Sequence, residues 1–155
     1  MKRQPYQDTS VPVGRTQEAL RKLMQDNKGF GLAIVSEQDL AGKEPPTEGF
    51  EAAISINETP YRIRVKASLR RPNKYTSDRQ KQLFREQEER RVWRVLYYHM
   101  KSVFEAHNSG VMELREMMLP YIIVPATNKT IGQHILPRMK EALEGRLLAA
   151  TSKVS

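Results

Sequence analysis

The chain has 155 residues, of which 39% are hydrophobic, and its formal net charge is +8. A chain of this length builds one domain with a real core and leaves little room for a second. It contains no cysteine, which excludes disulfides, thiolate metal sites and a cysteine nucleophile. No segment has the apolar length of a signal peptide or a membrane span, so we expect a cytoplasmic protein with no membrane partner.

The first part of the chain predicts an arm, a helix and a short strand. Residues 1–14 are polar and contain two prolines, which is typical of a flexible N-terminal arm. The run 32–36 predicts a short strand, and the loop from 37 to 49 is too long for a tight hairpin. Between arm and strand, Thr16 is placed to cap a helix that ends near residue 27, with one apolar face formed by Ala19, Leu20, Leu23 and Met24.

A β-hairpin is predicted next. Residues 50–56 alternate between apolar and polar, residues 57–60 have turn chemistry, and residues 61–69 alternate again. One face of the second strand is apolar, whereas the other carries cations about 7 Å apart, close to the phosphate spacing of an extended nucleic acid. A solvated sheet face is the alternative explanation. Because this strand contains no acid, we favour a surface that meets a polyanion.

The longest helical pattern begins at Asp78, after a loop at residues 70–77, and runs to about Asn108. A helix of this length spans about 45 Å, longer than a domain of this size needs. Its first half is almost wholly polar, so we expect that half to project from the domain. Its second half is expected to pack through an apolar face formed by Val92, Val95, Leu96, His99, Val103 and Phe104.

The C-terminal part of the chain predicts shorter elements. Residues 112–119 favour a helix, residues 121–125 a short strand and residues 126–129 a turn. Thr130 is placed to cap a last helix, which Pro137 bends or divides. The apolar positions of this helix are Ile131, Ile135, Met139, Leu143 and Leu147.

Together these elements predict a single α+β domain over residues 15–150, between the N-terminal arm and a disordered tail at residues 151–155. The expected architecture is a small antiparallel sheet of about three strands, packed against a long helix and followed by C-terminal helices.

All of the net charge lies between residues 61 and 94, where twelve basic residues stand against four acids. The other 121 residues balance at 14 basic and 14 acidic. Since phosphate attraction grows with local charge density, we predict a nucleic-acid-binding surface on the basic strand and the start of the long helix. Its residues are Arg62, Arg64, Lys66, Arg70, Arg71, Lys74, Arg79, Lys81, Arg85, Arg90, Arg91 and Arg94.

Four aromatic residues lie within or beside this basic stretch and are candidates for stacking on unpaired bases, which contributes about 1–3 kcal/mol for each base. Packing in the core is the alternative, and at helical spacing it is the commoner role of such residues. The four candidates are Tyr61, Tyr75, Trp93 and Tyr97.

The sequence offers no recognisable catalytic or metal site. It has no zinc-protease motif, phosphate-binding glycine loop or serine elbow. His99 falls on the predicted packing face of the long helix, and His107 and His134 have no acidic motif beside them. Glu113 with Glu116 is more typical of a solvated helix face than of a metal-ligand pair. We therefore expect a protein that is not an enzyme and that uses no cofactor or metal.

The second half of the chain carries a pattern that resembles a known group of proteins. Its residues are Arg91, Trp93, Arg94, Leu96, Lys101, Glu105, Ala106, Ser109, Gly110, Glu116, Leu119, Tyr121, Ile122, Val124, Pro125, Thr130, Ile131 and Gly132. With Val11, Pro12 and Val13 upstream, this pattern is similar to a family of small phage and prophage proteins that carry no assigned function. The resemblance covers about two-thirds of the chain. It implies a phage or mobile-element origin, and hence the host cytoplasm, but no particular reaction.

The expected order of one helix, three strands and a long helix also looks like the core of single-strand annealing proteins, in which a curved sheet backed by a helix holds a DNA strand. With the charge distribution, this predicts a nucleic-acid-binding protein of DNA replication or recombination. Single-stranded DNA is favoured and RNA is the alternative ligand, bound by a homo-oligomer or within a larger complex. The other hypothesis is a phage interaction or inhibitor protein that blocks a host defence or nucleic-acid-handling complex.

Overall fold

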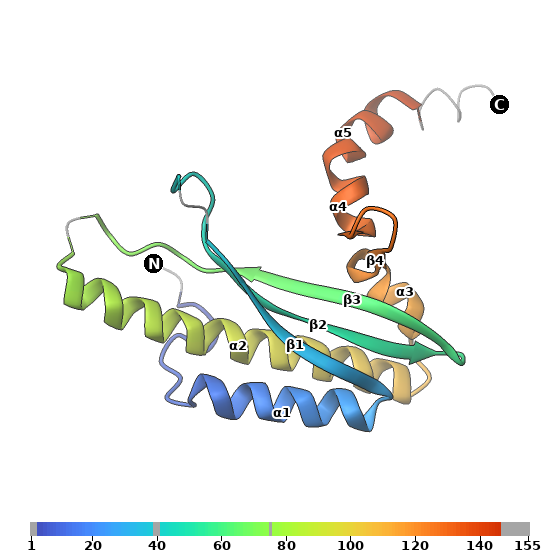
Figure 1. Cartoon of the computed structure of the whole chain (residues 1–155), viewed down its shortest axis with the longest axis horizontal. Coiled ribbons are helices and arrows are strands. Elements are labelled where there is room, and N and C mark those ends of the chain that lie inside the picture. Colours follow the sequence, from blue (N-terminus) through green and yellow to red (C-terminus); the bar gives the residue numbers. More distant parts are fainter. Residues whose placement is uncertain (1–2, 39–40, 75, 147–155) are drawn as a thin grey trace.

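The computed structural model describes residues 3–38, 41–74 and 76–146. Three antiparallel strands form a sheet in the order β1-β2-β3, and two helices cover one of its faces (Figure 1). These elements are α1 (Val13–Asp26), β1 (Gly29–Glu37), β2 (Thr47–Ile56), β3 (Thr59–Ser68) and α2 (Asp78–Asn108). We call the sheet face turned away from α1 and α2 the outer face. The predicted α+β class, with three strands against a long helix, is confirmed.

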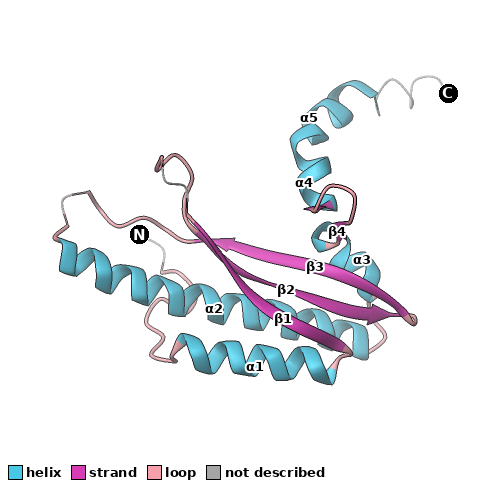
Figure 2. Ribbon diagram, in the orientation of Figure 1, coloured by secondary structure: helices cyan, strands magenta, loops and turns pink. Residues whose placement is uncertain are grey.

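The C-terminal segment begins with α3 at the end of α2 and then rises beside β3, away from α1 and α2 (Figure 2). A bridge between Ile63 and Ile122 joins it to β3. As expected, Thr130 caps a helix, in a box with Gln133, and the helix is divided at Pro137. The elements are α3 (Leu114–Met118), η1 (Leu119–Tyr121), β4 (Ile123–Val124), β5 (Lys129–Thr130), α4 (Ile131–Ile135), η2 (Leu136–Arg138), α5 (Met139–Glu141) and the π-helical turn η3 (Ala142–Arg146).

The first helix begins one turn earlier than the sequence indicated. Pro12 occupies the N-cap position, so α1 starts at Val13 and Thr16 lies inside the helix, where it caps nothing. The Thr16 side chain is buried, and its hydroxyl has no hydrogen-bond partner among the described residues. Proline fixes its own φ near the helical value and needs no N–H bond, which suits it to a helix start. The prediction that Thr16 caps this helix is therefore wrong.

The described part of the N-terminal arm lies against α2. The side-chain amide of Gln87 donates hydrogen bonds to the backbone carbonyls of Gln7 and Thr9, both at 2.9 Å. The ring of Tyr6 stacks on the ring of Tyr98. Nothing in the composition of residues 1–14 predicts these contacts, because their partners lie about 80 positions further along the chain. The predicted disordered tail at residues 151–155 lies outside the described residues.

The predicted hairpin is confirmed, and it sets the register of the outer face. Asn57 and Glu58 both have positive φ angles, 51° and 66°, as a two-residue type I′ turn requires. The strands β2 and β3 then pair without a register shift, from Ile56 opposite Thr59 at the turn to Thr47 opposite Ser68 at the other end. In the neighbouring strand, β1 begins at Gly29 and not at residue 32, and its register shifts between Phe30 and Ala33.

The core lies between the sheet and the two helices. The buried face of α2 confirms four predicted positions, Val92, Leu96, Val103 and Phe104, but His99 is exposed and Val95 only partly buried. This face is wider than one apolar stripe because α2 packs against both the sheet and α1. The remaining members of the core include Leu20, Met24, Phe50, Ile54, Ile63, Val65, Trp93, Met100, Leu114 and Met118.

Candidate nucleic-acid interface

The three cations of the basic strand lie on the outer face, as predicted, but they are matched by acids from the neighbouring strands. Glu51 on β2 accepts hydrogen bonds from Arg62 at 3.2 Å and from Arg64 at 2.6 Å. Glu37 on β1 accepts one from Lys66 at 2.6 Å. Three cations and two carboxylates leave this group with a charge of +1. The strand sequence contains no acid, but its sheet neighbours supply two.

Arg64 joins the sheet to the C-terminal segment. Its guanidinium donates to the backbone carbonyl of Asn128 at 2.9 Å and to the Asn128 side-chain oxygen at 3.3 Å, in addition to Glu51. Only 10% of the Arg64 side chain is exposed. Asn128 lies in the turn between β4 and β5 and has a positive φ. Arg64 therefore positions the C-terminal segment over β3, and each of its three guanidinium nitrogens already donates a hydrogen bond within the protein.

A buried carboxylate holds two further predicted cations. The side chain of Glu88 is 2% exposed and accepts hydrogen bonds from Arg91 at 2.6 Å and from Arg70, through its backbone N–H and its guanidinium, at 3.0 Å. Burial alone would raise the pKa of Glu88, but the bonds from Arg91 and Arg70 outweigh it and lower the pKa to about 2. This cluster fixes the end of the basic strand to α2.

Arg85 is also paired, in a second cluster that reaches the core. It contacts Glu89 at 2.7 Å and Glu48 at 3.8 Å. Glu48 in turn accepts a hydrogen bond from the indole N–H of Trp93 at 3.3 Å. Arg85 and Arg71 line an open hollow of about 410 Å³ at the end of the sheet, where Arg71 donates to the backbone carbonyl of Glu44 at 2.6 Å.

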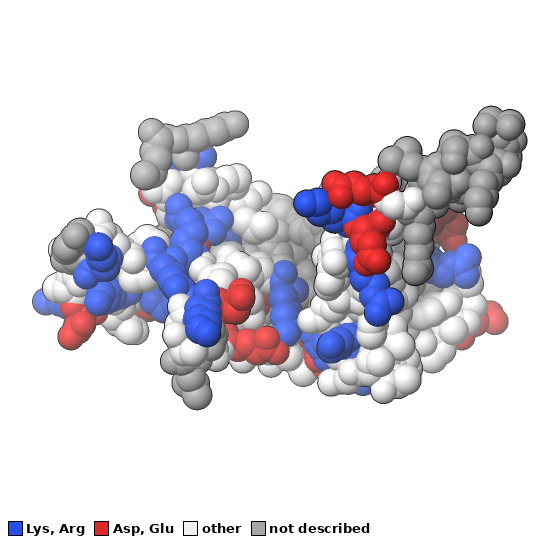
Figure 3. Space-filling view, turned by 90° about the horizontal axis from the view of Figure 1, so that it is seen from above, with Lys and Arg blue, Asp and Glu red and all other residues white. Residues whose placement is uncertain are grey.

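Several described cations of the predicted interface form no ion pair with a carboxylate, and some of them lie at the end of the molecule where α2 begins. Among the described residues, Arg71, Arg79, Lys81, Arg90 and Arg94 form no ion pair with an acid. Figure 3 looks onto the outer face and shows Lys and Arg side chains gathered towards the end where α2 begins. We call the residues of the 70–77 loop and of the first turns of α2 the basic end; its predicted cations are Arg71, Lys74, Arg79 and Lys81.

The predicted stacking residues that the structure describes have different environments. Trp93 is fully buried, so its ring packs in the core, which was the alternative role. Tyr61 and Tyr97 are partly buried and pack against the core, and Arg94 lies over the Tyr97 ring at 5.4 Å. Tyr75 lies outside the described residues. The exposed ring of Tyr98 was missed, although its spacing of four from Arg94 was a usable signal.

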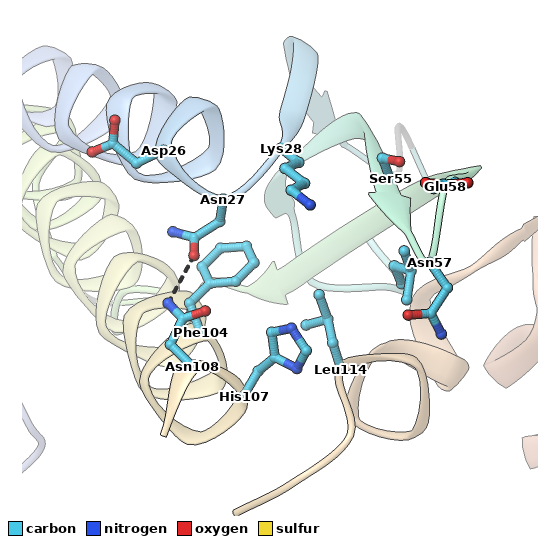
Figure 4. Close-up of a pocket in the computed structure, with 11 residues that line it drawn as sticks. Asp26, Asn27, Lys28, Ser55, Asn57, Glu58, Phe104, His107, Asn108 and Leu114 are labelled. Carbon is cyan, nitrogen blue, oxygen red and sulfur yellow. Dashed lines mark hydrogen bonds between the residues drawn. The ribbon is translucent and has the colours of Figure 1, made fainter. Parts of the chain in front are cut away.

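A hollow of about 290 Å³ lies at the opposite end of the molecule, between the ends of α1 and α2 and the hairpin turn (Figure 4). Phe104 and Leu114 contribute apolar side chains to it, and Asn108 donates to the Asn27 side chain at 3.0 Å. Lys28 and His107 line it together with the carboxylates of Asp26 and Glu58. With acids equal in number to the basic and histidine side chains, this hollow does not favour an anionic ligand.

The described histidines give no complete catalytic arrangement. The ring of His99 lies edge-on to Tyr121, with centroids 5.8 Å apart. Although His99 is exposed over part of its surface, the protein atoms around the ring displace some of its water, and this desolvation lowers its pKa. His134 lies 2.6 Å from the hydroxyl of Thr127, but both are exposed and no described carboxylate orients the imidazole. Within the same residues, no three His, Asp or Glu side chains converge as metal ligands. None of the described helices is long and apolar enough to cross a membrane.

Comparison with known proteins adds no relative: no family model, curated protein or solved structure matches the chain.

Proposed function

We propose that this protein binds nucleic acid, with single-stranded DNA as the favoured ligand, and acts in DNA replication or recombination without catalysing a reaction. The observation that carries the proposal is the basic end, where Arg71, Arg79 and Lys81 remain unpaired with acids while most neighbouring cations are neutralised within the fold. Because no described carboxylate neutralises these three cations, their charge is available to phosphates.

The outer face of β3 leads into the basic end and supports an extended ligand. Arg62 is 60% exposed, and its pairing with Glu51, like that of Lys66 with Glu37, is a surface ion pair. Such pairs contribute about 0–1 kcal/mol, so a phosphate can replace the carboxylate at little cost. Alternate residues of a strand are about 7 Å apart, which matches successive phosphates of a single strand.

A titration of the unmodified protein tests this proposal. Fluorescence anisotropy with labelled single-stranded DNA, duplex DNA and RNA of about 20 nucleotides is measured at several salt concentrations from about 50 to 300 mM. We expect the tightest binding to single-stranded DNA. We also expect log K to fall linearly with log salt, with a slope of about −2 to −4, from three to five phosphate contacts. Absence of binding to all three ligands at the lowest salt concentration contradicts the proposal.

A second candidate function is an interaction protein that blocks a host defence or nucleic-acid-handling complex, in line with the resemblance to phage proteins. The observation that favours it is an exposed apolar row on the C-terminal helices, formed by Ile135, Leu136, Met139 and Leu143. Ile135, Met139 and Leu143 are among the apolar positions that the sequence predicted for the last helix, whereas Leu136 was not predicted. Leu147, the last predicted position, lies outside the described residues. The same titration separates the two functions, because only nucleic-acid binding requires a salt-dependent affinity.

A further inference from the structure

A cluster of aromatic rings and cations covers the exposed side of α2, away from the basic strand. The rings of Tyr6 and Tyr98 are stacked, with centroids 5.2 Å apart and planes within 6°. The Arg94 guanidinium lies 4.9 Å from the Tyr98 ring centroid and donates to the Tyr98 hydroxyl at 2.9 Å. The ammonium of Lys101 lies 5.8 Å from the same centroid. Tyr98 is thus a fixed, partly exposed ring between two cations.

The ring that covers Tyr98 belongs to a weakly held segment. Besides the stack, the hydrogen bonds that join the described part of the arm to α2 are the two from Gln87 to the carbonyls of Gln7 and Thr9. Each hydrogen bond contributes about 1 kcal/mol. Tyr6 also has a φ of 57°, a conformation that non-glycine residues rarely adopt and that costs energy. Tyr6 itself is 41% exposed. A ligand that stacks on Tyr98 can therefore displace it.

The cations on this side of α2 continue from the basic end. Arg79, Arg90, Arg94 and Lys101 are separated by about three, one and two helical turns, so they share one face of the helix. From Arg79 to Tyr98 the helix rises about 30 Å, a distance that about five nucleotides of extended strand can follow at about 6–7 Å each. A strand held at the basic end can therefore reach the Tyr98 ring.

We propose that Tyr98 is a stacking site for an unpaired nucleobase and that Tyr6 occupies this site in the free protein. The inference rests on the proposed function and assigns it a second contact region. Arg94 and Lys101 hold the phosphates next to the stacked base, while the hydrogen bond from Arg94 keeps the Tyr98 ring in place. The Tyr6 ring must leave before a base can stack on Tyr98. The N-terminal arm therefore competes with single-stranded DNA for this site. Paired bases, which are already stacked, do not enter the site.

The test compares four variants by binding to single-stranded DNA and by the fluorescence of a 2-aminopurine base in the oligonucleotide. Tyr98→Leu is expected to weaken binding at least fivefold and to remove the quenching that stacking causes. Tyr98→Phe keeps the aromatic ring, so it is expected to retain the quenching and to lose less affinity, through the missing hydrogen bond from Arg94. Tyr6→Leu is expected to tighten binding severalfold, because the competitor is gone. Met112→Ala, which shortens an exposed apolar side chain between α2 and α3, is the control and leaves binding unchanged.

Each outcome decides a separate claim. If Tyr98→Leu binds like the Met112→Ala control while salt-dependent binding persists, the stacking site is wrong and the proposed function stands. If Tyr98→Leu weakens binding but Tyr6→Leu does not tighten it, the competition by the arm is wrong. If the unmodified protein does not bind single-stranded DNA at low salt, both proposals fail. Circular dichroism of each variant verifies that α2 is intact.

Discussion

Phe104→Ala is expected to lower the free energy of unfolding by about 3–5 kcal/mol, the cost of removing a large ring from a packed core. The Phe104 side chain is 1% exposed and belongs to the cluster that also contains Leu20, Ile54 and Leu114. It therefore joins both helices, the sheet and the C-terminal segment. Because domains of this size are stable by about 5–15 kcal/mol, the variant should lose a large part of its stability.

Urea unfolding followed by circular dichroism measures this loss. Phe104→Leu is the control, because it keeps an apolar side chain of similar reach and should cost less than half as much. A loss below about 1 kcal/mol for Phe104→Ala would mean that the ring does not pack as the structure shows.

The Glu88 cluster is expected to make the protein sensitive to acid. The pKa of Glu88 is about 2 in the folded protein, below the ordinary value of 4.5 that it has when unfolded. A carboxyl group whose pKa is lowered by folding contributes stability above its unfolded pKa and loses it as the pH falls towards the folded pKa. The contribution of Glu88 is therefore complete above about pH 4.5 and disappears between pH 4.5 and 2. Its size is about 3 kcal/mol.

Glu88→Gln should remove this contribution. At pH 7 the variant is expected to be less stable by about 3 kcal/mol, because Arg70 and Arg91 lose their shared carboxylate at a buried position. Between pH 4.5 and 2 its stability should fall less steeply than that of the unmodified protein. Glu86→Gln, an exposed position on the same helix, is the control and should keep the original pH dependence. Parallel pH profiles for all three proteins would contradict the pKa assigned to Glu88.

The elements of the fold could be predicted where their signals are local. The long helix runs from Asp78 to Asn108 as expected, because Ser77 and Gln80 form a capping box at its start and apolar positions recur along its second half. The hairpin turn at Asn57 and the helix cap at Thr130 could also be predicted from the local sequence. At Thr16, two local signals competed, and Pro12 determined where the helix starts.

The charge balance of the candidate site could not be predicted, because it depends on residues far apart in the sequence. Glu51 pairs with Arg64 only through the register of β2 and β3, and Glu88 reaches Arg70 from 18 positions along the chain. A sequence shows how many cations a segment has, but not which of them the fold neutralises. The contact of Tyr6 with Tyr98 is hidden for the same reason.

The central claim is that the basic end supplies the phosphate contacts, and a comparison of two triple variants tests it most directly. One carries Arg71→Gln, Arg79→Gln and Lys81→Gln. The other removes the same total charge from exposed positions elsewhere, with Arg15→Gln, Lys22→Gln and Lys140→Gln.

The measurement is the slope of log K against log salt for single-stranded DNA. We predict that the slope of the basic-end variant becomes shallower by about 2, as the loss of three phosphate contacts requires, and that the slope of the matched variant stays unchanged. Equal slopes for the two variants would contradict the account, since binding would then depend on the net charge of the protein and not on the basic end.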